Sequence, residues 1–201
     1  MIRVDFYKAS NHGNEYSMLK AEESDHYNLT VISDGAFNSL PTLYELEFQA
    51  NIDLFDGVPF LGLNKLSYFR VYNGKQSSLQ KIFDSAPKLW TFVFQTGLEH
   101  LEDGVFEGFP LLEEINLADN RLTSLNKAFH GLIGLTHLEY IVLSSNKLTS
   151  LDDSFDELPY IQSIDLSNNS LVSINGVFEN LAGGRINIEG NANLSTHTII
   201  K

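Results

Sequence analysis

The side chains that could carry acid–base or metal chemistry are dispersed along the sequence. Two acidic pairs, Glu113 with Glu114 and Asp152 with Asp153, offer too few oxygens for a hard cation, which takes about six to eight ligands. The histidines show no metal-ligand spacing and stand at His12, His26, His100, His130, His137 and His197. We therefore predict that the chain holds neither a metal ion nor a cofactor.

Catalytic motifs are also absent from the sequence. There is no G-x-x-x-x-G-K-[ST] phosphate loop, no G-x-G-x-x-G, no H-E-x-x-H and no G-x-S-x-G. The chain contains no cysteine, which excludes disulfides, thiolate zinc ligands and cysteine nucleophiles. These absences predict that the protein is not an enzyme.

The composition is that of a folded, acidic protein with a sizeable core. Of its 201 residues, 43% are hydrophobic and 19% are charged, and 13 Lys and Arg against 26 Asp and Glu give a formal net charge of −13. Such a surface repels a phosphate backbone, so we predict no nucleic-acid partner. No apolar run reaches the roughly eighteen residues of a membrane span, so we predict no membrane insertion either.

Residue types that are common in protein interfaces gather in one short segment. Tyr68, Arg70 and Tyr72 alternate with the apolar residues Phe69 and Val71. Tyrosine and arginine are enriched among the residues that dominate binding energy, and alternation with apolar residues is typical of a strand with one buried face. The segment therefore predicts a binding surface on the outer face of a sheet, although tyrosine also favours strands without any partner.

The elements that would position this segment recur at a fixed spacing. One series of phenylalanines is separated by 23, 23, 23, 23, 26 and 23 residues, and its members are Phe37, Phe60, Phe83, Phe106, Phe129, Phe155 and Phe178. A second apolar series keeps step with it at Leu46, Phe69, Phe92, Ile115, Ile141 and Ile164, and a third follows two residues later. A constant period indicates a stack of similar coils, with one three-residue insertion.

Each repeat reads L-x-x-L-x-L-x-x-N, clearest from Leu112 to Asn120. Apolar residues two apart predict one short strand per repeat, and successive strands would stack in parallel at about 4.8 Å. A buried asparagine amide both donates and accepts, so it can satisfy backbone groups of neighbouring coils. Gly74 and Gly97 replace it in two repeats, where we expect a looser stack.

These repeats resemble the leucine-rich repeat superfamily, in particular the class of about 23–24 residues in Toll-like and Slit-like extracellular proteins and invertebrate immune repeat proteins. The resemblance covers roughly residues 27–191, including the G-x-F elements that end at Phe37, Phe106 and Phe178. It implies an α/β chain that is mostly β, with short helices or 3₁₀ turns. It also implies a right-handed solenoid whose curved parallel sheet forms a concave, partner-binding face. The disulfide-rich caps common in extracellular members are missing.

The two ends of the stack need caps, because an open end would expose core and unpaired strand edges. We assign residues 1–26 to an N-terminal cap that is predicted to be a β-hairpin. Residues 27–182 hold the repeats, and residues 183–201 hold a last strand and a C-terminal cap. Alternatively, the chain is a piece of a longer protein.

The predicted partner-binding residues lie on the outward positions and margins of the strands. The patch centres on Tyr68, Arg70, Tyr72 and Val93, with acidic residues at its rim. Its full membership is Glu45, Glu47, Tyr68, Arg70, Tyr72, Trp90, Val93, Glu114, Tyr140 and Val142.

Three sequons, at Asn28, Asn168 and Asn193, would accept N-glycans in a secretory cell, although such triplets also arise by chance among repeat asparagines. The phenylalanine class favours an extracellular or cell-surface location over an intracellular one, and the missing cysteines argue the other way.

We expect a non-catalytic recognition module that binds a protein or peptide on its concave face, in immunity or cell-surface adhesion. Its acidity favours partners with basic patches. One alternative is a regulatory or targeting segment of a larger receptor or enzyme. Another is a structural stack that forms homo-oligomers.

Overall fold

The structure is a computed structural model of the chain. It describes residues 3–11, 14–22, 31–49, 52–83, 86–132, 135–158, 160–174, 176–178, 181 and 183–195. Asn28 and the predicted cap boundary at residue 26 lie outside these ranges.

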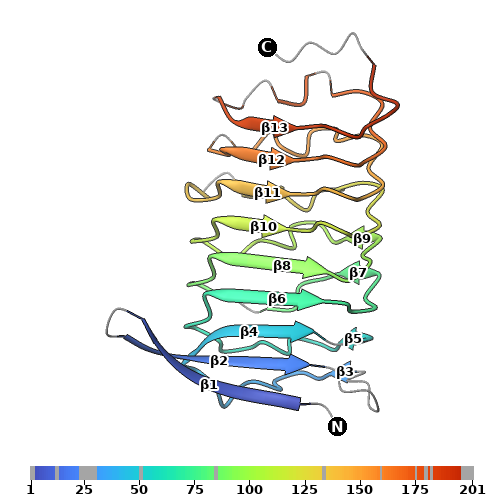
Figure 1. The fold of residues 1–201 in the computed structure, drawn as a ribbon. Helices are drawn as coiled ribbons and strands as arrows, with labels where there is room; N and C mark the ends of the chain where they lie inside the picture. The colour runs from blue at the N-terminus through green and yellow to red at the C-terminus, as the bar shows by residue number, and fades with distance from the viewer. Residues whose placement is uncertain are drawn as a thin grey trace.

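One nine-stranded sheet runs the length of the stack, in the order β1-β2-β4-β6-β8-β10-β11-β12-β13 (Figure 1). Its strands are β1 (Arg3–Asn11), β2 (Asn14–Glu22), β4 (Leu43–Gln49), β6 (Tyr68–Tyr72), β8 (Thr91–Gln95), β10 (Glu114–Asn116), β11 (Tyr140–Val142), β12 (Ser163–Asp165) and β13 (Arg185–Asn187). Two small sheets pair β3 (Val31–Ile32) with β5 (Leu54–Phe55) and β7 (Ser78–Leu79) with β9 (His100–Leu101).

The pairing register confirms the repeat. From β4 to β13 neighbouring strands are parallel, and equivalent residues such as Phe69 and Phe92 lie opposite each other. The insertion leaves this register unchanged, because Glu114 still pairs with Tyr140. The three extra residues therefore lie in the return segment rather than in a strand.

An antiparallel hairpin of β1 and β2 covers one end of the stack (Figure 1). Strand β2 then pairs in parallel with β4, with Leu19 opposite Leu46. The Ser17 hydroxyl donates a hydrogen bond to the Thr42 carbonyl oxygen at 2.9 Å. The hairpin thus occupies the hydrogen-bonding edge that β4 would otherwise expose.

A stack of phenylalanine rings packs along the core. Ring centroids of Phe106 and Phe129 are 5.5 Å apart, those of Phe129 and Phe155 are 5.9 Å apart, and those of Phe155 and Phe178 are 5.8 Å apart. Large offset-stacked rings bury much apolar surface per residue, so each coil adheres to the next.

The return segments differ from the expectation in one respect. Within the described ranges there is no helix, so the expected short helices are not formed, while turns with the 3₁₀-type hydrogen bond are present. In these turns an N–H donates to a carbonyl three residues back, as from Ala128 to Leu125 at 3.1 Å. Left-handed residues such as Asn126 (φ 48°) and Asp152 (φ 44°) interrupt the return path, and a right-handed helix does not accommodate them. The chain is therefore mostly β.

A ladder of buried asparagines ties each coil to the preceding one. Asn146 Nδ2 donates to the carbonyl oxygen of Leu143 in its own coil at 3.0 Å and to that of Leu117 in the previous coil at 2.9 Å. Its Oδ1 accepts from the Leu122 N–H at 3.0 Å. Asn120, Asn169 and Asn191 make equivalent contacts.

We expect Asn146→Ala to lower the free energy of unfolding by about 2–4 kcal/mol, because it leaves buried backbone groups without partners. Chemical denaturation would measure the change. Asn64→Ala is the matched control, since Asn64 is exposed in a turn, and it should stay within about 0.5 kcal/mol. Equal losses in the two variants would contradict a structural role for the ladder.

Candidate functional site

The strand β6 directs its polar side chains away from the core. Phe69 and Val71 are fully buried, whereas Tyr68, Arg70 and Tyr72 between them are partly exposed. This alternation follows from the two-residue period of a strand. We call the face made by the outward residues of the nine-stranded sheet the open face.

Aromatic rings from three neighbouring coils meet at one margin of this face. The ring centroids of Tyr44 and Tyr68 are 5.4 Å apart, and those of Tyr68 and Trp90 are 6.5 Å apart. The Arg70 guanidinium carbon lies 5.1 Å from the centroid of the Tyr68 ring, which is cation–π range. Tyr68 is thus held on three sides, and its ring is available to a partner at little cost in side-chain entropy.

Two acidic residues of the predicted rim, Glu45 and Glu47, are paired with nearby cations. Arg70 forms an ion pair with Glu45. Lys20 of the hairpin lies 3.2 Å from the Glu47 carboxylate, which also accepts a hydrogen bond from Gln49 Nε2 at 2.8 Å. These pairs orient Arg70 and reduce the local charge, so the surface that this face exposes is mainly aromatic and hydrogen-bonding.

The tyrosine hydroxyls on the open face remain protonated at neutral pH. Burial, together with a hydrogen bond to Tyr44, raises the pKa of Tyr68 above its ordinary value. Burial also raises the pKa of Tyr72, against the opposing effect of Arg70. The Tyr72 hydroxyl can therefore donate a hydrogen bond to a partner, whereas the Tyr68 hydroxyl is already hydrogen-bonded to Tyr44 and can accept one.

The structure brings only part of the predicted patch together on the surface. Val93 is only 5% exposed and lies beneath the surface, between Arg70 and Asn116 in the register, so it offers a partner little contact area. Tyr140 is 44% exposed, but β10 separates it from the aromatic cluster. Val142 is partly buried on the same distant strand, and Glu114 lies between the two groups.

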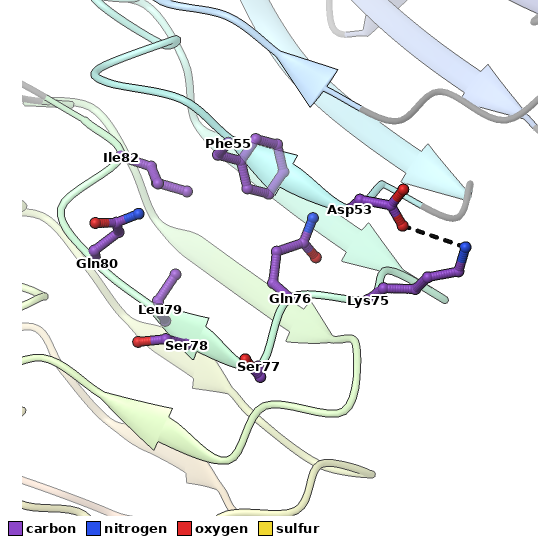
Figure 2. Close-up of a pocket in the computed structure, with 9 residues that line it drawn as sticks. All are labelled: Asp53, Phe55, Lys75, Gln76, Ser77, Ser78, Leu79, Gln80 and Ile82. Carbon is purple, nitrogen blue, oxygen red and sulfur yellow. Dashed lines mark ion pairs between the residues drawn. The ribbon is translucent and has the colours of Figure 1, made fainter.

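A separate cavity opens where the two small sheets fail to join (Figure 2). Strand β5 pairs with β3, and β7 pairs with β9, but β5 and β7 do not pair with each other. Gln76 lies between them, and an ion pair of Asp53 with Lys75 at 3.2 Å crosses the gap at one side.

Gln76 takes a position that leucine or isoleucine holds in other coils. In several coils the N–H just before this position donates to the carbonyl of the equivalent residue one coil back, as from Lys75 to Ile52 and from Lys147 to Leu122. Gln76 Nε2 adds a second bond to the Ile52 carbonyl at 2.6 Å. Its buried Oε1 has no hydrogen-bond partner, and this costs about 1–3 kcal/mol.

Gly74 explains the shape of this region. It stands where later coils have the ladder asparagine, and a Cβ there would collide with Gln76 Oε1. The side-chain amide of Gln76, two residues after Gly74, therefore occupies the space that the ladder asparagine fills in later coils. Gly97, the second such glycine, is supported instead by the next coil, since its N–H donates to Asn120 Oδ1 at 2.9 Å.

Two features are absent from the described part of the chain. No group of three or more His, Cys, Asp or Glu side chains there is arranged to hold a metal ion. Over the same ranges, no helix has the length and apolar character needed to cross a bilayer.

Comparison with known proteins agrees with the coil architecture. The family model described as Leucine rich repeat matches residues 95–139 and 136–192. The chain is a leucine-rich repeat protein.

Among solved structures, the leucine-rich repeat chain is similar to TLR13 in the crystal structure of a TLR13–ssRNA13 complex. The TM-score is 0.57 at 17% sequence identity, a level that speaks for the shared fold alone. The match covers 82% of this chain but 28% of that one, so the chain spans less than a third of its neighbour's length. No curated protein matches it.

Sequence reasoning missed the roles of Lys20 and Gln76 in the leucine-rich repeat stack. Lys20 was hidden because its role depends on the hairpin lying beside β4. Gln76 carried a readable signal, since a polar residue interrupts a column of leucines two positions after Gly74. Among the sequons, Asn168 and Asn193 are exposed.

We expect Gln76→Leu to stabilise the leucine-rich repeat stack by about 1 kcal/mol. The change removes an unsatisfied buried acceptor and restores the apolar column, while the Ile52 carbonyl keeps its bond from the Lys75 N–H at 2.8 Å. Thermal unfolding would measure the gain. Gln80→Leu, at an exposed position in the same cavity, should have little effect. A clear loss of stability in Gln76→Leu would show that the amide contributes more than it costs.

Proposed function

We propose that this leucine-rich repeat protein is a non-catalytic recognition module that binds a protein or peptide partner on its open face. The observation that supports this is the cluster of Tyr44, Tyr68, Arg70 and Trp90, whose rings and guanidinium hold one another in place. Ordered aromatic and arginine side chains are the usual centre of a protein interface.

The charge of the chain bears on the class of partner. The formal net charge is −13, and the rim carboxylates of Glu45 and Glu47 are already paired. A partner with a basic patch would be drawn by the overall field, while its contact with the open face would be made through aromatic surface and tyrosine hydroxyls. We place this recognition at the cell surface or outside the cell, in adhesion or immunity.

A second candidate is that the chain acts as a regulatory or targeting segment of a larger receptor or enzyme. The 28% coverage of the neighbouring TLR13 chain favours it, because similar repeats there belong to a longer protein. The same open face would serve in either setting.

We expect the double variant Tyr68→Ala with Tyr72→Ala to weaken partner binding at least tenfold, since truncating a central aromatic residue costs about 2 kcal/mol or more. Quantitative crosslinking and mass spectrometry from the native source would compare recovery by the wild-type chain and the variant. Tyr160→Ala, at an exposed tyrosine on a distant coil, is the control. Equal recovery by all three proteins, each with native unfolding behaviour, would remove the open face as the binding site.

We also expect no measurable binding of a single-stranded RNA oligonucleotide at physiological salt. The ssRNA in the TLR13 complex raises the question, and the charge of −13 argues against such a ligand here. Fluorescence anisotropy over a salt series would measure the interaction. Saturable binding that weakens steeply with salt would overturn the expectation.

A further inference from the structure

A second hollow lies beside the open face, at the margin where strands β4, β6 and β8 begin. It is lined by residues of neighbouring coils, and two columns of equivalent positions supply them. Tyr44, Ser67 and Trp90 are spaced 23 residues apart, and Lys65 and Lys88 are spaced likewise two residues earlier. We call the hollow formed by these five residues the margin groove.

The groove exists because a small residue stands between two large ones. Ser67 is 6% exposed, and it separates Tyr44 from Trp90 in the column. Trp90 itself is 41% exposed, a high value for so large an apolar side chain. Ser67 thus leaves a slot lined by Tyr44 and Trp90, beside the Tyr68 ring that packs against both. Leu111, one coil further along, extends the apolar lining.

The groove also carries positive charge in an acidic protein. Lys65 and Lys88 are both exposed, and neither has an acidic side chain within ion-pair distance among the described residues. By contrast Lys75 and Lys81 pair with carboxylates at 3.2 Å and 2.7 Å. One coil beyond Trp90, the equivalent position holds the exposed Glu113. Its negative charge marks where the positively charged part of the margin ends.

We propose that the margin groove binds an acidic peptide segment of a partner protein. One apolar side chain of the segment enters the slot over Ser67, and its carboxylates pair with Lys65 and Lys88. Charge complementarity selects this occupant, because two ammonium groups that have no ion pair with a described acid lie beside an apolar slot, and together they recognise an anion that carries an apolar side chain. The groove shares the Tyr44 and Trp90 rings with the open-face cluster, but its cations are Lys65 and Lys88, whereas the open-face cations Arg70 and Lys20 are already paired with acids.

Trp90 makes the proposal directly measurable, because it is the only tryptophan in the chain. The probes are short synthetic peptides without tryptophan, in which leucine or phenylalanine is flanked by glutamate or aspartate. Titration into the full chain should change the Trp90 emission saturably and weaken as salt increases. Matched peptides with glutamine and asparagine in place of the acids should bind at least tenfold more weakly, and lysine peptides should not bind.

The matched variants separate groove binding from general attraction. We expect Lys65→Glu with Lys88→Glu to weaken the acidic peptide at least tenfold. Lys127→Glu with Lys147→Glu, which makes the same charge change at exposed positions of other coils, should leave affinity within about twofold. Thermal unfolding would verify that both variants fold.

Three outcomes would overturn the proposal. The first is that no acidic peptide in the series changes the Trp90 emission. The second is that the peptide binds the two charge-reversed variants equally. The third is that vesicles of anionic lipid or a neutral oligosaccharide change the emission while the peptides do not, which would assign the groove to a different occupant.

Discussion

The structure depends on one constraint: backbone groups buried inside the stack must find partners in the coils next to them. The strands meet it through in-register parallel pairing, and the ladder asparagines meet it in the turns, where Asn146 joins Leu117 of one coil to Leu143 of its own. If one coil shifted its pairing register by one residue, these backbone groups would lose their hydrogen-bond partners. The three-residue insertion before β11 is therefore accommodated outside the strands, and Glu114 keeps its place opposite Tyr140.

Register in turn converts distant sequence positions into columns of neighbouring side chains. Residues 23 apart become neighbours at strand spacing, so that Tyr44, Ser67 and Trp90 line one hollow although no short stretch of sequence contains them. The same stacking produces two surfaces of different character. On the open face Arg70 and Lys20 are paired with carboxylates, whereas at the margin Lys65 and Lys88 are not paired with any described acid.

The irregular coils and the candidate binding surfaces occupy the same part of the molecule. Gly74 and Gln76 break the asparagine ladder and the leucine column, and the small sheets are interrupted beside them. The exposed aromatic cluster lies on the adjoining strands β4, β6 and β8. The family model matches from residue 95 onward, a range that contains the ladder asparagines Asn120, Asn146, Asn169 and Asn191. The coils that depart from the repeat are thus the ones that carry the exposed aromatic cluster. These departures lower the stability of the stack, and the regular coils offset that loss.

The amino-acid sequence by itself determined the repeat, the parallel strands, the buried phenylalanine stack and the outward direction of Tyr68, Arg70 and Tyr72. These features follow from the period and alternation of residue types, which are local properties of the chain. Only the tertiary structure decided that Arg70 pairs with Glu45, that Val93 lies beneath the surface and that turns replace helices in the return path. The ion pair and the burial depend on how far a side chain reaches across to the next coil, and the turns depend on the φ angles of single residues. The spacing of residue types in the sequence encodes neither of these.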